Sequence, residues 1–157
     1  MSEYYEPNED TTNVFNGVIS KASLPSTLKI AIRSNNREKD LYRVDKTNEL
    51  MRSETKKEIY IVVNELIFEQ LEEQHQLLVA EEAITSIVYD IEKDKISLKR
   101  GDVGITKRGA FSGILKKFGA ETYEVVQESV KTLYNAKKEE AEVWWHQKKF
   151  QNIMKTL

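Results

Sequence analysis

Residues 77–90 constrain the fold of this chain most, because they combine the apolar spacing of a helix with a run of carboxylates. The apolar positions recur at intervals of three and four, which places them on one helical face; they are Leu77, Ala80, Ile84, Ile87 and Ile91. Glu81 and Thr85 share the neighbouring face, and Glu82 lies beside them. The spacing predicts a helix over residues 74–90 whose apolar side packs inward.

The composition limits the class of protein. A chain of 157 residues with 39% hydrophobic residues fits one domain with one core. Cysteine is absent, which excludes disulfides, thiol nucleophiles and cysteine zinc sites. The net charge of -2 gives no general attraction to nucleic acids or anionic membranes. Neither a membrane span nor a signal peptide is visible, so we expect a soluble cytoplasmic protein that makes no membrane contact.

Three segments are predicted to be strands of a small sheet. Residues 28–33 alternate apolar and polar side chains, and residues 41–44 show a weaker strand pattern. Residues 59–63 are β-branched or aromatic throughout, which is typical of a central strand buried on both faces. The Asn35-Asn36 pair predicts a hairpin-like connection between the first two segments, and residues 95–99 predict a short strand or an extended return.

Other segments carry helical signals. Asn64 follows the central strand and is predicted to cap a helix over residues 65–70. Residues 111–119 predict a short helix that ends at Gly119. A final helix is predicted from about residue 122, and charged helix formers extend it past residue 137. Its first part carries an apolar stripe made of Val126, Val130 and Leu133.

Together these elements predict an α+β fold, with a small β-sheet packed on the helix of residues 74–90 and a long C-terminal helix. Residues 1–13 hold four acidic residues and no basic ones, so we expect a flexible acidic arm over residues 1–20. The domain itself is predicted to span residues 21–135. Residues 136–157 form a charged helical extension that contains a tryptophan pair.

The order of short motifs along the chain resembles a known family. A strand ending in Asn64-Glu65 leads through an acidic helix to Glu73-Gln74, then to the frame of residues 81–85, and then to Tyr89-Asp90. This order resembles the phage-type metallopeptidases, small zincin-like proteins of phages and prophages. The resemblance covers residues 28–135 and implies that the helix around residue 82 is a zincin-like active-site helix.

In that family an H-E-x-x-H helix holds zinc through two histidines, and its glutamate acts as the general base. Carried over to this chain, the ligand positions are Glu81, Thr85 and Gly101, and the base is Glu82. Only Glu82 keeps the family residue, whereas catalytic zinc needs about three protein ligands. The resemblance therefore implies a pseudoenzyme without a cofactor, in which Glu82 is catalytic only if some activity remains.

A metal-dependent hydrolase is the first alternative. Glu81, Glu82 and Asp102 are oxygen ligands of the kind that Mg²⁺ and Mn²⁺ prefer. Adjacent positions on a helix diverge by about 100°, however, so Glu81 and Glu82 do not easily reach one ion. The other interpretation of the same residues is a solvated helix face.

A nucleic-acid-associated regulator is the second alternative. Residues 65–94 hold nine acidic residues and one basic residue, whereas residues 95–117 hold seven basic residues and one acidic residue. Glycines in the basic loop 95–117 lie near side chains that bind phosphates; these are Lys99, Arg100, Lys107 and Arg108. Pairing of this loop with the acidic helices explains the charge pattern equally well.

The C-terminal extension supplies the candidate partner-binding residues, which are Trp144, Trp145 and Phe150. Aromatic side chains dominate protein–protein hot spots, and these follow a charged segment that has little core to join. The alternative is that the helix folds back and buries them. The preferred function is a non-catalytic, metallopeptidase-like phage or prophage protein that binds a protein partner through its C-terminal helix, in the host cytoplasm if it is phage-encoded.

Overall fold

A three-stranded mixed sheet lies at the centre of the computed structural model, which describes residues 4–99 and 112–156, the last 16 of these partly by backbone alone. Strand β1 (Ile30–Ser34) runs parallel to β3 (Ile59–Val63), which pairs antiparallel with β2 (Tyr42–Lys46). The strand order β1-β3-β2 makes β3 central, as its composition predicted. The predicted hairpin through Asn35-Asn36 is wrong, because β3 separates β1 from β2.

Helix α1 (Glu9–Lys21) occupies most of the predicted N-terminal arm of residues 1–20. The Asn8 side chain caps it by accepting a hydrogen bond from the backbone of Thr11. Phe15 is fully buried, and its ring centroid lies 5.5 Å from that of Phe68. The prediction of an arm differs from the structure because two of the acidic residues of this segment, Glu9 and Asp10, lie in the first turn of α1, where they stabilise a helix.

Helix α4 (Glu73–Thr85) is shorter than the predicted helix of residues 74–90. Residues beyond its cap form β4 (Ile87–Asp90), which pairs antiparallel with β5 (Lys95–Leu98) in a separate two-stranded sheet. The helical spacing of the apolar residues continues into β4, but pairing with β5 determines the local structure. Ile91, placed on the helical stripe by its spacing, is 82% exposed in the turn of this hairpin.

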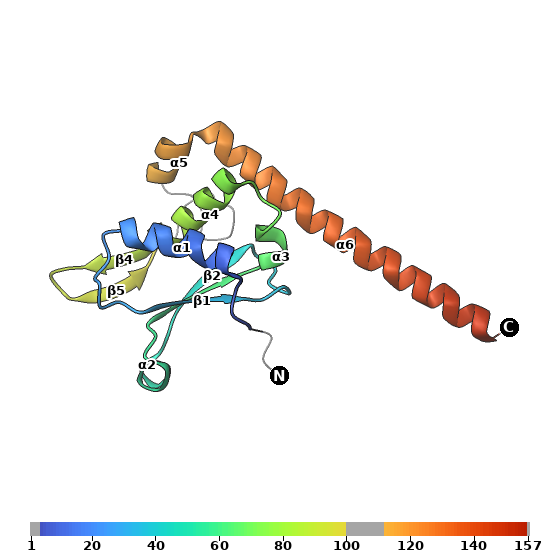
Figure 1. The fold of residues 1–157 in the computed structure, drawn as a ribbon, viewed down its shortest axis with the longest axis horizontal. Coiled ribbons are helices and arrows are strands. Elements are labelled where there is room, and N and C mark those ends of the chain that lie inside the picture. Colours follow the sequence, from blue (N-terminus) through green and yellow to red (C-terminus); the bar gives the residue numbers. More distant parts are fainter. Residues whose placement is uncertain (1–3, 100–111, 157) are drawn as a thin grey trace.

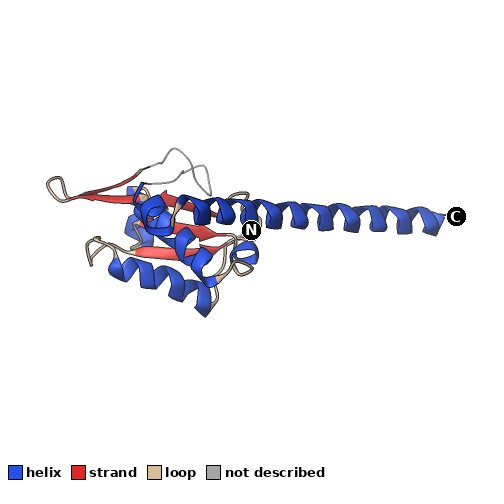
Figure 2. Ribbon diagram, turned by 90° about the horizontal axis from the view of Figure 1, so that it is seen from above, coloured by secondary structure: helices blue, strands red, loops and turns tan. Residues whose placement is uncertain are grey.

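Three shorter helices complete the domain. Asn64 caps α3 (Glu65–Phe68), as predicted, and α2 (Glu49–Thr55) follows β2 with its own cap at Asn48. Helix α5 (Ser112–Phe118) is followed by Gly119, whose φ of +88° favours glycine and ends the helix as predicted. Helices α1 and α4 cover one face of the central sheet (Figures 1 and 2).

Helix α6 (Ala120–Thr156) has 37 residues, so it is about 55 Å long. Its first turns pack on the domain through the buried side chains of Tyr123, Val126 and Val130. The rest of the helix projects away from the domain (Figures 1 and 2). No described helix is both long enough and apolar enough to cross a membrane. The described part of the chain is therefore an α+β domain with a long C-terminal helix, which confirms the predicted fold class.

Candidate functional site

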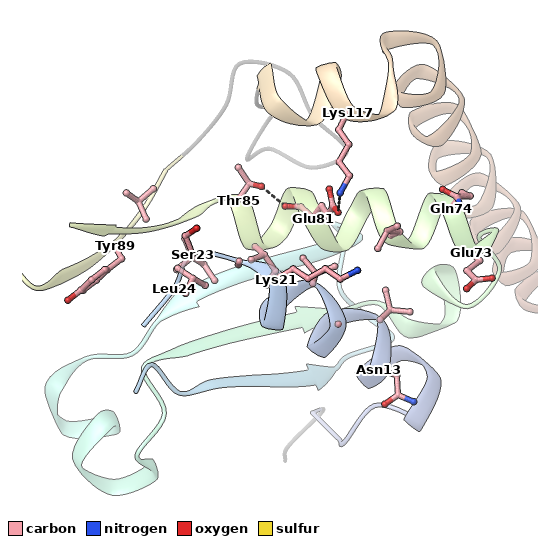
Figure 3. A pocket seen from close by; sticks show the side chains of 18 residues that line it. Asn13, Lys21, Ser23, Leu24, Glu73, Gln74, Glu81, Thr85, Tyr89 and Lys117 are labelled. Atoms are coloured by element: carbon pink, nitrogen blue, oxygen red, sulfur yellow. Dashed lines mark hydrogen bonds and ion pairs between the residues drawn. The ribbon is translucent and has the colours of Figure 1, made fainter. Parts of the chain in front are cut away.

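A groove of about 860 Å³ lies between α1 and α4 and extends to β4 (Figure 3). The two helices run in the same direction. Asp10 and Asn13 of α1 line a neighbouring hollow together with Glu73 and Gln76 of α4, so the N-terminal turns lie together. The C-terminal turns, with Lys21 on α1, also lie at one end. The groove therefore follows two parallel helices over about three turns.

The floor of the groove and part of its walls are apolar. Val18 and Ile84 are buried in its floor, and Val14 and Leu77 are half-buried in its walls. Gly17 lies in the middle of α1 and lines the groove without a side chain. A Cβ atom added to Gly17 would meet no atom within 4 Å. The centre of the groove thus has open space over α1.

The two ends of the groove carry opposite charge. Lys21, in the last turn of α1, lines the half of the groove at the helix C-termini, and the groove continues past it to Leu24 and to Tyr89 of β4. Glu73 lies at the opposite end, and Asp10 and Glu69 line the hollow that continues it. Between the ends, Lys117 of α5 pairs with Glu81 (Figure 3), so these two charges offset one another. Among the described residues, the half of the groove at the helix C-termini therefore carries the unpaired charge of one lysine in its lining, whereas the opposite end is acidic.

Glu81 and Glu82, adjacent in the sequence, have different surroundings. The Glu81 carboxylate lines the groove and binds Lys117, and the Thr85 hydroxyl donates to the Glu81 carbonyl oxygen over 2.7 Å. Glu82 is fully buried. Its Oε1 accepts a hydrogen bond of 2.6 Å from Tyr42, and its Oε2 accepts one from Tyr123. Glu82 thereby connects α4 to β2 and to α6.

This arrangement bears on the predicted metal site of Glu81, Glu82 and Asp102. The first two carboxylates diverge, as helix geometry requires. Asp102, like the third ligand position Gly101, lies outside the described residues. Within the described residues, no three His, Cys, Asp or Glu side chains are grouped to hold a metal ion. The three-carboxylate site stays a prediction.

The other predicted binding residues are only partly described. Lys99 donates its backbone N–H to the Ser86 carbonyl oxygen over 2.8 Å, directly after β5. The remaining basic residues, Arg100, Lys107 and Arg108, lie outside the described residues. Trp144, Trp145 and Phe150 belong to the helical backbone of α6, but their side chains lie outside what the structure describes. Their predicted roles are not tested by the geometry.

Sequence interpretation missed the groove because it assigned α1 to a flexible arm. A signal was present: Asn8 precedes a segment in which Thr11, Phe15 and Val18 recur at helical spacing, and all three are buried. It also missed the tyrosines that bind Glu82. Tyr42 and Tyr123 lie 40 and 41 residues from Glu82 along the chain, so no local pattern connects them.

Comparison with known protein families, curated proteins and solved structures found no match to this chain. The resemblance of residues 28–135 to phage-type metallopeptidases therefore remains a prediction.

Proposed function

We propose that this protein is a non-catalytic binding module that holds a protein partner through the distal part of α6. We define distal α6 as residues 138–156 and proximal α6 as residues 120–137. The observation that carries the proposal is the length of helix beyond the domain. The Lys137 ammonium donates to the Asn36 carbonyl oxygen, and α6 continues for another 19 residues to Thr156.

Such an extension needs a reason, because most helical stability in proteins comes from packing of a helix face on other elements. The described side chains of distal α6 are exposed; they are Lys138, Glu139, Glu140, Gln147, Lys148 and Lys149. Between its acidic and basic residues the segment carries Trp144 and Trp145. Tryptophan is among the residues most enriched at binding hot spots. A partner that packs on distal α6 would stabilise the helix that the domain leaves exposed.

The surroundings of Glu82 support the non-catalytic part of the proposal. A general base needs access to water or substrate and a free oxygen to accept the proton. Glu82 is fully buried, and both of its carboxylate oxygens accept hydrogen bonds from tyrosine hydroxyls. We therefore assign Glu82 a structural role. Descent from a phage-type metallopeptidase is part of this proposal and rests on the order of the sequence motifs alone.

Photo-crosslinking tests the proposal. A benzophenone amino acid replaces Gln147 in distal α6 or, as a matched control, Glu54 in α2; both native side chains are exposed. We expect crosslinked protein from position 147 and none from position 54. Truncation after Glu142 should remove capture of the same partner by the truncated chain. Equal crosslinking from both positions, or none from position 147, would contradict a binding role for distal α6.

A further inference from the structure

We infer that distal α6 docks in the groove between α1 and α4 of a second copy of this chain. This inference rests on the proposed function and names the partner. Its first support is the order of charges. Distal α6 begins with Glu139, Glu140 and Glu142 and continues to Lys148 and Lys149. The groove has Lys21 in the half at the helix C-termini and acidic residues at the opposite end, so a helix antiparallel to α1 and α4 matches both charges.

The lengths of the two charge patterns also agree. Asp10 and Lys21 are 11 residues apart on α1, which corresponds to about 16 Å along the helix axis. Glu140 and Lys148 are eight residues apart on one side of α6, which corresponds to about 12 Å along the helix axis. Glu140 and Lys148 lie within about a quarter turn of each other, with Trp144 between them, so both charged residues can face the groove at once. In the antiparallel direction the dipole of distal α6 also runs opposite to the dipoles of α1 and α4, which is the favourable arrangement.

The centres of the two surfaces are complementary in chemistry. Trp144 and Trp145 lie between the acidic and basic residues of distal α6. The middle of the groove has apolar side chains and open space over Gly17, beside the ion pair of Glu81 and Lys117. Amphipathic helices bind in grooves of this kind by burying large apolar side chains between two helices. The groove thus offers distal α6 an apolar centre between two charged ends.

A second copy is the occupant because distal α6 does not reach the groove of its own chain. Helix α6 is continuous from Ala120 to Thr156 and projects away from the domain (Figures 1 and 2). It contains neither proline nor glycine, the residues at which helices usually kink. Exchange of distal α6 between two copies creates two identical interfaces related by a twofold axis.

Sedimentation velocity of the purified full-length protein tests the inference, and we expect a concentration-dependent dimer. Lys21→Glu should raise the dimer Kd by up to about fivefold, because it places like charges together. Glu140→Lys alone should do the same, and the double variant should recover the wild-type Kd. Lys29→Glu changes an exposed lysine that does not line the groove and serves as the control.

Gly17→Trp supplies an independent test, because it fills the open space at the centre of the groove. The substitution should preserve the fold, since a Cβ at this position meets no atom within 4 Å. We expect the dimer Kd to rise by at least about tenfold, with circular dichroism unchanged. Gly17→Ala, which adds one methyl group, should keep the dimer.

Two results would overturn the inference. One is a wild-type protein that stays monomeric at every concentration. The other is a dimer that survives Lys21→Glu and Gly17→Trp but is lost on truncation after Glu142, which would indicate pairing of two α6 helices with each other. In the monomeric case, crosslinking from position 147 to a different protein would leave the proposed function standing. In that case, absence of any crosslink would contradict both the proposed function and the docking of distal α6 in a second copy.

Discussion

The proximal and distal parts of α6 form one continuous helix, but different forces support them. Proximal α6 is an element of the domain, because Tyr123, Val126 and Val130 are buried against its core. Every described side chain of distal α6 is exposed. Strong helix formers such as alanine, lysine and glutamate favour a helix in this segment. Helical structure at a position therefore does not show that the position contributes to folding.

Polar contacts reinforce the same division. Tyr123 donates to the buried Glu82, and the Tyr134 hydroxyl donates to the Glu38 carbonyl oxygen over 3.1 Å. The Lys137 ammonium donates to the Asn36 carbonyl oxygen one turn further on. These three bonds attach proximal α6 to α4 and to the loop after β1. Substitutions in proximal α6 should therefore affect stability, whereas substitutions in distal α6 should affect association.

Val126→Asp should have the largest effect on stability. Val126 is fully buried, and an unpaired carboxylate at that site should lower the free energy of unfolding by more than about 3 kcal/mol. Gln147→Asp introduces the same side chain at an exposed position of distal α6 and should change that free energy by less than about 0.5 kcal/mol. Denaturant unfolding of both variants measures the difference. Similar losses of unfolding free energy in the two variants would contradict the division of α6 into a proximal part that stabilises the domain and a distal part that does not.

Tyr123→Phe should have the next largest effect. The change removes the hydroxyl that donates to Oε2 of Glu82, and the loss of a buried donor to a carboxylate costs about 1–3 kcal/mol. Tyr5→Phe removes a hydroxyl from a residue that is 50% exposed and should leave the free energy of unfolding unchanged. Equal stability of Tyr123→Phe and the wild type would show that this bond does not anchor α6.

Tyr134 should make the stability of the domain depend on alkaline pH. Burial raises the pKa of Tyr134 above its ordinary value of 10.0, because it disfavours the phenolate. The unfolded chain ionises first, so the stabilisation is complete below about pH 10 and falls as the pH rises. The loss should approach about 1.4 kcal/mol per pH unit. Unfolding of Tyr134→Phe should show a smaller slope above pH 10, whereas an identical slope would contradict the burial of Tyr134.

Gly17→Ala should raise the free energy of unfolding slightly, whereas Val126→Asp and Tyr123→Phe lower it. Alanine favours a helix interior by about 0.5–1 kcal/mol over glycine, and the added Cβ has free space. We expect a higher free energy of unfolding in thermal or denaturant unfolding. A loss of stability would show that the space over α1 is occupied within the chain itself.

Much of the fold was predictable from local signals. The composition of β3 indicated a central strand, Asn64 indicated a helix cap, and Gly119 indicated the end of α5. The stripe of proximal α6 was also correct, because Val126 and Val130 are both buried. Each of these signals lies within a few residues of the structure that it determines.

Features that depend on distant residues were not predictable in the same way. The helical spacing through Ile87 continues into β4, and only pairing with β5 makes this segment a strand. The tyrosines that bind Glu82 come from β2 and α6. The groove requires α1, whose acidic first turn was interpreted as a flexible arm. The candidate site thus depends on packing between elements that the sequence separates widely.

Truncation after Glu142 tests the central claim most directly. Unfolding is measured at a concentration low enough for the monomer to dominate, because association would otherwise raise the apparent stability. The account predicts cooperative unfolding with the free energy of the full-length chain, together with complete loss of self-association in sedimentation velocity. Loss of cooperative unfolding in the truncated chain would mean that distal α6 belongs to the core, and would contradict the account.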